Sequence, residues 1–367
     1  MGGLSRVGFL DLEERVELVK RNTLEVVTEE ELRGLLEAGR PRGYLGYEPS
    51  GLVHIGWLVW MFKVRDMVEA GVDFTILEAT WHAYINDKLH GNLDLIRRAA
   101  RVVRAVLDSL GLEGKVRYVD AEDLASDKEY WGLVLRVLKA NSLARIKRAL
   151  TIMGRRADEA ELDASKLVYP AMQVSDIFYM GIEVALGGMD QRKAHMLARD
   201  TAEKLGYKKP VAVHTPIISS LKGPGRMEAA ERDDLLAEVK MSKSKPETAV
   251  FLHDPPDVVR RKILRAYCPA RQVEFNPIME INRYILFAQP GFKLHVDRKP
   301  KYGGPVEYHS YEELERDFVE GRLHPLDLKN ATAEALNKLL EPIRSRLLSD
   351  PEARSAIEEI EKAGVTR

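Results

Sequence analysis

The sequence contains a single cysteine, Cys268, among its 367 residues. One cysteine excludes a disulfide framework and any zinc site built on several cysteine ligands. No apolar run approaches the length needed to cross a bilayer, and the acidic, polar start at residues 11–15 is not a signal peptide. The formal net charge of -1 gives no global basic surface, so nucleic acid would have to bind a local patch. We therefore expect a cytoplasmic protein without membrane association and with no metal site of its own.

Glutamine is also rare, and two of the four glutamines lie close together. Gln173 falls in a predicted helix over residues 169–180, and Gln191 follows in the run from Gly187 to Lys193. A chain that otherwise avoids glutamine but keeps two in one neighbourhood indicates amide groups placed for a ligand.

The predicted helix carries a polar stripe on an otherwise apolar surface. We expect Pro170 in its first turn and Gly181 just past its end. Tyr169, Gln173 and Asp176 are spaced at i, i+4 and i+7, so they share one side of the helix. Burying Asp176 among apolar neighbours is costly unless another group hydrogen-bonds to it. The stripe either faces solvent or a partner domain, or lines a binding pocket.

Strands alternating with helices predict an α/β fold, a doubly wound Rossmann-like parallel sheet, over roughly residues 1–220. Residues 8–40 are expected to be helical. Residues 122–165 have a helical pattern rich in arginine and lysine, which indicates a helical insertion between two halves of the sheet. Residues 221–254 form a polar connector, and residues 255–367 a smaller, mainly α-helical domain. Strands are expected at residues 43–47, 72–79, 116–119, 182–186 and 210–216.

In an open parallel sheet, ligands bind where the loops at the carboxyl ends of the strands meet. One such loop, Glu48 to Gly51, leads into a helix whose first turn holds His54 and Gly56. The unpaired N–H groups and the dipole of a helix start favour an anionic phosphate. Gly56 lacks a Cβ, which would let a flat base lie against the backbone, and His54 could donate to a phosphate or a ring oxygen. The spacing matches neither a Walker loop nor a dinucleotide fingerprint.

A second cluster, Lys240-Met241-Ser242-Lys243-Ser244-Lys245-Pro246, lies in the polar connector. Three lysines with interleaved serines could form a flexible clamp that neutralises a leaving pyrophosphate once substrate is bound. The alternative is an ordinary solvated lysine run, but a string with an internal methionine and two serines is more specific than that.

These motifs carry a family resemblance. The pair formed by His54-Ile55-Gly56-Trp57 and residues 240–244 resembles the two signatures of class I aminoacyl-tRNA synthetases. The stretches that resemble the tyrosyl-tRNA synthetases of the archaeal and eukaryotic type are Gly43 to Gly46 with Tyr44, the helix with Tyr169, Gln173 and Asp176, Gly187 to Gln191, and His324 to Lys329. The resemblance covers nearly the whole chain, from about residue 30 to residue 345.

The resemblance implies a role for each matching residue. Tyr44 and Asp176 would bind the phenolic hydroxyl of tyrosine, and Tyr169, Gln173 and Gln191 its α-amino group. Those expected to bind ATP are Gly46, His54, Gly56, Asp190 (at the ribose) and Lys243, and those expected to act in catalysis are His54, Gly56, Lys240 and Lys243.

The implied reaction activates L-tyrosine with ATP, which serves with Mg²⁺ as a substrate, and no tightly bound cofactor is expected. The tyrosine carboxylate attacks the α-phosphate, pyrophosphate leaves, and tyrosine is then transferred to the terminal adenosine of tRNA(Tyr). No step needs a protein nucleophile, so catalysis would come from positioning and from stabilising the developing phosphate charge. Phenylalanine would leave Tyr44 and Asp176 unpaired, which removes the need for an editing site.

For tRNA, the resemblance implies that Arg192 and Lys193 approach the acceptor end. It also implies that the chain forms a homodimer. The helical insertion at residues 122–165 would contribute to the dimer interface, and its charges would guide tRNA.

The C-terminal domain would read the anticodon through Tyr302, His324 and Asp327. Asp327 could accept hydrogen bonds from a guanine edge, and Tyr302 could stack on a base, which suits recognition of a single-stranded loop. The alternative for Asp327 is a helix N-cap before Leu328.

Three positions depart from the family pattern. Trp57 stands where the full signature has a second histidine, so the role of that histidine is absent or met elsewhere. Thr80 stands where relatives usually carry aspartate, and the connector at residues 226–239 is longer and more acidic than expected. Nearby, we expect His82 to be a hydrogen-bonded wall residue and Tyr179 to lie in the core.

Three other functions compete with tyrosine activation. A tryptophanyl-tRNA synthetase would share the fold and both signatures, but an indole offers only a donor and needs no pair of Tyr44 and Asp176. A nucleotidylyltransferase acting on a small metabolite would leave the C-terminal motif unexplained. A non-catalytic RNA-binding paralogue would not need intact ATP-binding residues.

Overall fold

The computed structural model describes residues 10–154, 163–224, 241 and 246–364. Within these residues, six strands form one sheet in the order β1-β6-β5-β2-β3-β4. Neighbouring strands run parallel except β1, which pairs antiparallel with β6 at one edge. The doubly wound Rossmann-like sheet is therefore confirmed. The strands are β1 (Glu25–Val27), β2 (Arg42–Tyr47), β3 (Asp73–Glu78), β4 (Arg117–Asp120), β5 (Val184–Gly188) and β6 (Val211–Thr215).

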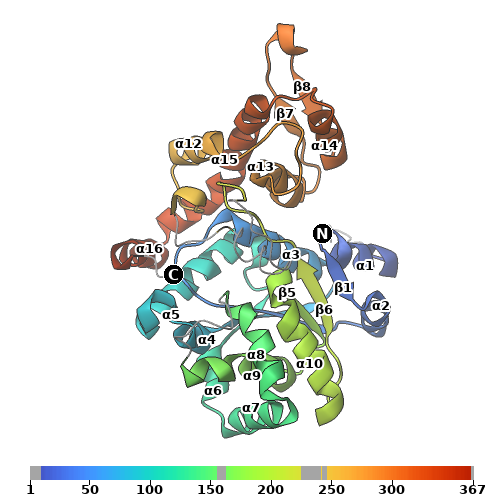
Figure 1. The fold of residues 1–367 in the computed structure, drawn as a ribbon, viewed down its shortest axis with the longest axis vertical. Helices are drawn as coiled ribbons and strands as arrows, with labels where there is room; N and C mark the ends of the chain where they lie inside the picture. The colour runs from blue at the N-terminus through green and yellow to red at the C-terminus, as the bar shows by residue number, and fades with distance from the viewer. Residues whose placement is uncertain (1–9, 155–162, 225–240, 242–245, 365–367) are drawn as a thin grey trace, which may run out of the picture.

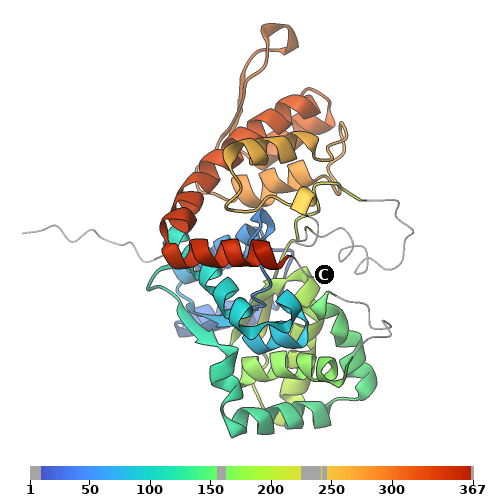
Figure 2. The ribbon, with the colours of Figure 1, turned by 90° about the vertical axis from the view of Figure 1, so that its left-hand side faces the viewer.

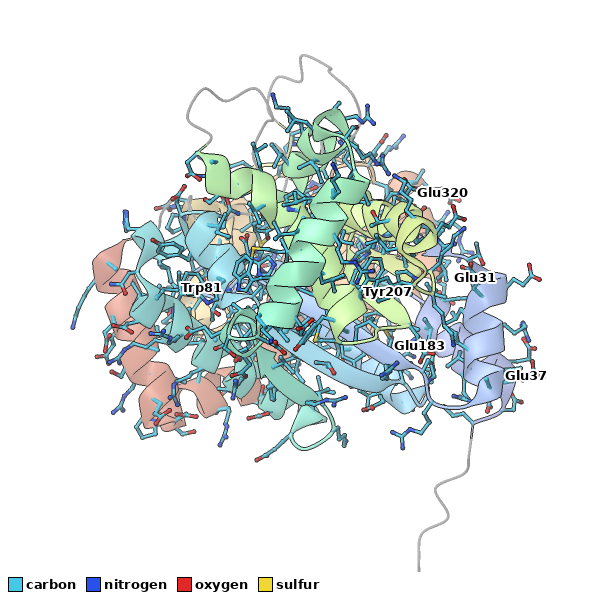
Figure 3. All side chains as sticks on the ribbon, turned by 90° about the horizontal axis from the view of Figure 1, so that it is seen from below. Glu31, Glu37, Trp81, Glu183, Tyr207 and Glu320 are labelled. Atoms are coloured by element: carbon cyan, nitrogen blue, oxygen red, sulfur yellow. The ribbon has the colours of Figure 1, made fainter. Side chains whose placement is uncertain are left out.

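Strand β1 interrupts the helical region that was expected over residues 8–40. Two helices do form there, α1 (Leu12–Lys20) and α2 (Glu29–Ala38). The strand between them has three residues with half-buried side chains, too short for an alternating pattern to stand out in the sequence. Seen from below (Figure 3), Glu31 and Glu37 mark α2 on the side of the molecule away from Trp81.

Helices cover both faces of the sheet, because successive side chains of each strand point to opposite sides. In β2, Leu45 belongs to the hydrophobic cluster of one face and Tyr44 to that of the other. This arrangement leaves the carboxyl ends of the strands as the place for a ligand. The first cluster includes α3 (Leu58–Glu69) and α5 (Leu93–Leu107), and the second includes α7 (Lys128–Ala140), α9 (Ala164–Tyr179) and α10 (Arg192–Leu205).

Between β4 and β5, the described elements are all helices, which agrees with the helical insertion expected at residues 122–165. The shorter helices there are α6 (Ala121–Ala125) and α8 (Leu143–Ala149), beside α7 and α9. In Figure 1 these helices lie in the lower part of the molecule, below the sheet.

Helix α9 begins at Ala164, earlier than expected. The prediction that Pro170 occupies the first turn is wrong, since Pro170 lies inside the helix. Asp163 caps the helix instead, because its Oδ1 accepts a hydrogen bond from the backbone N of Ser165 at 3.0 Å. Gly181 follows the helix with a positive φ of 62°, as expected of a glycine beyond a helix end.

The C-terminal part, residues 255–364 of the described chain, lies mostly above the sheet in Figure 1 and is mainly helical, as expected for residues 255–367. The last helix, α16, packs against α5 (Figure 2), where Arg98 Nη1 donates to Glu359 Oε1 at 2.9 Å. The bounds of the individual domains stay a prediction. No helix in the described part of the chain is both long and apolar enough to cross a membrane. The elements of this C-terminal part are α12 (Pro256–Arg265), α13 (Pro277–Ile281), β7 (Leu294–Val296), β8 (Val306–Tyr308), α14 (Tyr311–Val319), α15 (Pro325–Ser349) and α16 (Pro351–Ala363).

Candidate active site

A cavity of about 440 Å³ lies at the carboxyl ends of the parallel strands. Its wall is formed by the ends of β2, β5 and β6, by α9 and by the start of α3. It therefore brings together every described residue that was predicted to bind tyrosine or ATP. These residues are Tyr44, Gly46, His54, Gly56, Tyr169, Gln173, Asp176, Asp190 and Gln191.

Asp176 is buried in the wall of this cavity and has two close neighbours. Tyr130 Oη donates a hydrogen bond to its Oδ1 at 2.7 Å, and His82 Nε2 lies 3.1 Å from its Oδ2. His82 is a wall residue as expected, but neither of its ring nitrogens is aligned for a hydrogen bond with the described residues. The buried hydroxyl of Tyr44 hydrogen-bonds with Gln173, and burial together with the charge of Asp176 raises the pKa of Tyr44. Tyr44 is therefore a neutral phenol beside a carboxylate.

The sequence did not point to Tyr130. It lies on α7 in the helical insertion, where a tyrosine among apolar residues is indistinguishable from a core residue. Burial and the charge of Asp176 raise the pKa of Tyr130, so its hydroxyl keeps the proton that it donates. Its ring packs edge-on against Tyr179, with centroids 5.6 Å apart. The prediction that Tyr179 is a core residue is wrong, since its side chain is 37% exposed and its hydroxyl donates to Asp127.

A second group of side chains surrounds Glu48, which follows β2. Tyr169 Oη donates to Glu48 Oε1 at 2.7 Å, and Asn86 Nδ2 donates to the same oxygen at 2.9 Å. Gln173 Nε2 donates to Gln191 Oε1 at 3.3 Å, while Gln173 Oε1 is buried without a hydrogen-bond partner among the described residues. A carboxylate and an unsatisfied amide oxygen in the wall of one cavity suit a cation with several N–H donors, such as an ammonium group. Sequence reasoning missed Glu48, although an acidic residue in a turn that closes a strand was a usable signal.

His54 and Gly56 lie at the short helix η1 (Ile55–Trp57), which leads into α3. His54 is buried and caps η1, because its Nδ1 accepts a hydrogen bond from the backbone N of Gly56 at 3.2 Å. With Nδ1 as the acceptor, the ring proton of a neutral imidazole resides on Nε2, where it can be donated to an oxygen. A Cβ at Gly56 would lie 2.9 Å from His54 Cε1, so a side chain there would displace the ring.

Backbone pairing joins this segment to the chain that follows the lysine-rich run. Ile55 N donates to Val250 O at 2.9 Å, and Leu252 N donates to Val53 O at 2.9 Å. On the other side, Met241 lines the cavity, and its backbone N donates to Ile218 O at 2.9 Å. The predicted catalytic residues Lys240 and Lys243 lie outside the described residues.

Comparison with known proteins agrees with this geometry. A sequence profile described as tRNA synthetases class I (W and Y) matches residues 37–341. The tyrosine–tRNA ligase of Aeropyrum pernix is 70% identical over 356 residues, which are 96% of this chain and 98% of that protein. The chain belongs to the tyrosyl-tRNA synthetases. The tyrosine–tRNA ligase of Sulfurisphaera tokodaii is likewise 58% identical over 98% of this chain and 99% of that protein.

A solved structure extends the likeness to the whole fold of the synthetase. The crystal structure of Pyrococcus horikoshii tyrosyl-tRNA synthetase complexed with L-tyrosine is 42% identical and has a TM-score of 0.89. The match covers 95% of this chain and all of that one (100%). The resemblance inferred from the signatures is confirmed, and the chain is a tyrosine–tRNA ligase. The alternatives of a tryptophanyl-tRNA synthetase, a nucleotidylyltransferase and a non-catalytic paralogue are wrong.

Tyr130→Phe in this synthetase should raise the KM for tyrosine about tenfold. The change removes a hydrogen bond to a charged acceptor, and such bonds contribute about 1.5–3 kcal/mol. The variant should also discriminate less between tyrosine and phenylalanine, because Asp176 loses the donor that fixes its orientation. Tyrosine-dependent exchange of pyrophosphate into ATP measures both effects. An unchanged KM for tyrosine would show that Tyr130 has no part in binding the phenol.

The residues predicted to contact the acceptor end of tRNA lie at the start of α10, directly after Gln191. Arg192 Nε donates to Glu25 Oε1 at 2.6 Å, and its side chain is exposed, whereas Lys193 is half-buried. Neither lines the cavity, so their role stays a prediction.

The residues predicted to read the anticodon lie in the C-terminal part. Tyr302 lies between β7 and β8 with 60% of its surface exposed. The alternative that Asp327 is a helix N-cap is wrong, because His324 caps α15. The Nδ1 of His324 accepts a hydrogen bond from Leu326 N at 3.1 Å. Asp327 is half-buried in the first turn of that helix.

Thr80 stands where relatives usually carry aspartate, but another aspartate lies next to it. Thr80 Oγ1 donates a hydrogen bond to Asp120 Oδ1 at 2.5 Å. The acidic connector at residues 226–239 lies outside the described residues. Within the ranges that the structure describes, no group of three or more histidine, cysteine or acidic side chains is arranged to hold a metal ion.

Proposed function

We propose that this synthetase activates L-tyrosine with ATP and transfers it to tRNA(Tyr) in the cytoplasm, with the cavity described above as its active site. The observation that carries the proposal is the buried Asp176, held by Tyr130 in the same cavity as His54 and Gly56. A buried carboxylate needs donors to offset its lost hydration, and a phenolic hydroxyl is such a donor on an otherwise apolar ring. The cavity therefore selects a phenol.

Tyrosine binds with its hydroxyl between Tyr44 and Asp176. Its α-ammonium group donates to Glu48 and to the buried Oε1 of Gln173, near Gln191. Tyr169 holds the Glu48 carboxylate in place through its hydroxyl. Phenylalanine fills the same apolar volume but leaves the carboxylate without its donor, so it is rejected without a second, hydrolytic site.

Activation joins the tyrosine carboxylate to the α-phosphorus of ATP. A carboxylate oxygen forms the new O–P bond as the bond from the α-phosphorus to the bridging oxygen breaks, and pyrophosphate leaves with that electron pair. ATP binds as substrate together with Mg²⁺. His54 donates a hydrogen bond from Nε2 to a phosphate oxygen, and Asp190 accepts a hydrogen bond from a ribose hydroxyl. Gly56 leaves room for the nucleoside, and Gly46 leaves room for the triphosphate group. Lys240 and Lys243 neutralise the leaving pyrophosphate.

Transfer follows at the same place. A ribose hydroxyl of the terminal adenosine of tRNA attacks the carbonyl carbon of tyrosyl-adenylate, and an ester bond forms as the bond from that carbon to the phosphate oxygen breaks. AMP leaves with the electron pair of the broken bond, and its phosphate takes up the proton of the hydroxyl. Arg192 and Lys193 guide the acceptor end, because they lie at the start of α10 directly after Gln191.

We propose that the anticodon binds to the C-terminal part, at Tyr302, His324 and Asp327. Asp327→Ala should raise the KM for tRNA(Tyr) about tenfold, because loss of a base-edge contact costs about 1–3 kcal/mol. Pyrophosphate exchange should not change. Asp257, in the first turn of α12, provides a matched control. Asp257→Ala removes an exposed acid from a comparable helix position in the same C-terminal part. An equal fall in exchange and aminoacylation would contradict the anticodon assignment.

Exposed apolar side chains support a homodimer. Trp131 and Leu135 lie one turn apart on α7 and are 42% and 66% exposed, and Leu143 at the start of α8 is 59% exposed. Large apolar groups that are exposed to solvent favour contact with another protein surface. A second copy of this chain would cover them, and Leu135→Glu would then yield monomers in sedimentation equilibrium.

Aminoacylation tests the whole proposal. The wild-type protein should attach tyrosine, and neither phenylalanine nor tryptophan, to tRNA(Tyr). Tight tRNA binding without any attachment of tyrosine would contradict the proposal.

A further inference from the structure

Trp57 is a member of the first signature to which the proposed function gives no task. It follows Gly56 at the end of η1 and is half-buried. It lines the same cavity as His54 and Gly56, and so does Trp60 one turn further along α3. Two indole rings thus belong to the part of the wall that carries the residues assigned to ATP.

The two indoles are packed into a cluster of rings with Tyr47, the last residue of β2. Trp57 meets Tyr47 edge-on with centroids 5.7 Å apart, and Trp60 stacks on Tyr47 at 5.9 Å. The centroids of Trp57 and Trp60 are 5.7 Å apart, and Trp57 lies edge-on to His54 at 6.3 Å. Each ring is therefore supported by at least two others, which fixes the orientation of Trp57 beside His54.

Buried polar groups hold this cluster from behind. Tyr47 Oη donates to Glu78 Oε1 at 3.2 Å, and the buried carboxylate of Glu78 forms an ion pair with Arg104. Arg104 Nε donates to Glu78 Oε1 at 2.5 Å. Burial and the negative charge of Glu78 raise the pKa of Tyr47, so its hydroxyl stays protonated as the donor. An indole held in this way loses little conformational entropy when a ligand packs against it.

An indole and a histidine offer different chemistry at this position. An imidazole binds a nucleotide chiefly by donating or accepting hydrogen bonds, whereas an indole presents a large apolar face that attracts flat rings. We propose that Trp57, supported by Tyr47 and Trp60, is the wall against which the nucleoside part of ATP packs, and that it sets the affinity for ATP by ring contact. This inference rests on the proposed function, because it takes ATP as the ligand near His54 and Gly56.

Kinetics of three variants separate the possible roles of Trp57. Trp57→Ala should raise the KM for ATP in pyrophosphate exchange about tenfold, while the KM values for tyrosine and pyrophosphate stay within about twofold, because base stacking concerns the nucleoside alone. Trp57→Phe should recover most of the affinity, since it keeps an aromatic face. Trp81→Phe is the control, because Trp81 is a half-buried tryptophan that does not line the cavity and packs against Tyr84.

Three outcomes would overturn the inference. They are an unchanged KM for ATP, a KM for pyrophosphate that rises as much as that for ATP, and a KM for tyrosine that rises equally. The second would mean that Trp57 acts on the phosphates, and the third that the whole cavity was damaged. Failure of the proposed function is a separate result, because the wild-type protein would then show no tyrosine-dependent exchange.

Fluorescence gives a readout that does not depend on turnover or on the stability of the alanine variant. ATP should change the tryptophan emission of the wild-type protein, whereas inorganic tripolyphosphate at the same concentration should not. The change should be largely lost in Trp57→Phe and retained in Trp81→Phe. Retention of the full ATP-dependent change in Trp57→Phe would contradict the inference.

Discussion

Asp176→Ala should lower kcat/KM for tyrosine in pyrophosphate exchange at least about 100-fold, because a hydrogen bond to a buried charge contributes about 1.5–3 kcal/mol and the hydroxyl of Tyr130 would also lose its acceptor. The KM for ATP should change little, since His54 and Gly56 belong to a different element of the fold. Steady-state exchange with each substrate varied in turn separates the two effects.

Asp127 provides a matched control for this change. It also accepts a hydrogen bond from a tyrosine, Tyr179, but it is not among the residues that line the cavity. Asp127 also caps α7, which carries Tyr130, so Asp127→Ala should change the kinetics of tyrosine activation far less than Asp176→Ala does. Tyrosine activation that survives in Asp176→Ala at a level close to that of Asp127→Ala would remove Asp176 from the site.

Asp66→Ala should destabilise the protein by about 3–5 kcal/mol, the usual cost of removing one partner of a buried ion pair. Lys63 is fully buried, and its Nζ donates to Leu18 O at 2.9 Å and lies 3.2 Å from Asp66 Oδ2. Arg21 donates to the same carboxylate. Without Asp66, the charge of Lys63 would have no carboxylate to offset its burial. Urea unfolding at neutral pH measures the loss.

The exposed pair of Glu13 and Arg33 provides the control, because Glu13→Ala removes a carboxylate that solvent already screens. Surface ion pairs contribute about 0–1 kcal/mol. Equal losses of stability in Asp66→Ala and Glu13→Ala would contradict the importance given to burial around Lys63.

The same cluster predicts how stability depends on pH. Burial lowers the pKa of Lys63 to about 8, below its ordinary value of 10.5, although Asp66 opposes the shift. The unfolded chain therefore binds more protons than the folded protein between these values, and the contribution of Lys63 to stability rises as the pH increases from about 8 to 10.5. The loss caused by Asp66→Ala should be smaller at pH 9.5 than at pH 7, because Lys63 is then largely neutral. A loss that grows with pH would contradict this account.

The polar stripe on α9 shows what the sequence could predict. The helical spacing of Tyr169, Gln173 and Asp176 brings all three to one cavity, and the two rare glutamines, Gln173 and Gln191, contact each other at 3.3 Å. Local spacing and composition were sufficient here, because each of these residues belongs to a single element whose period is fixed.

Contacts between distant elements could not be predicted in this way. Tyr130 reaches Asp176 from α7, and Tyr169 reaches Glu48 from across the cavity wall. Both pairings depend on how the insertion and the sheet pack against each other. The residues next to Tyr130 or Glu48 in the sequence do not reveal that packing. The same limit explains Tyr179, since an aromatic residue at the end of an apolar helix has equal reason to lie in the core or at its rim.

The most direct measurement of the central claim is exchange of labelled pyrophosphate into ATP by the wild-type protein, with tyrosine, phenylalanine and tryptophan supplied one at a time. A cavity with Asp176 and Tyr44 at the phenol predicts rapid exchange with tyrosine and none above background with phenylalanine or tryptophan. Exchange that proceeds with tryptophan but not with tyrosine, or with no amino acid, would contradict the assignment of this cavity.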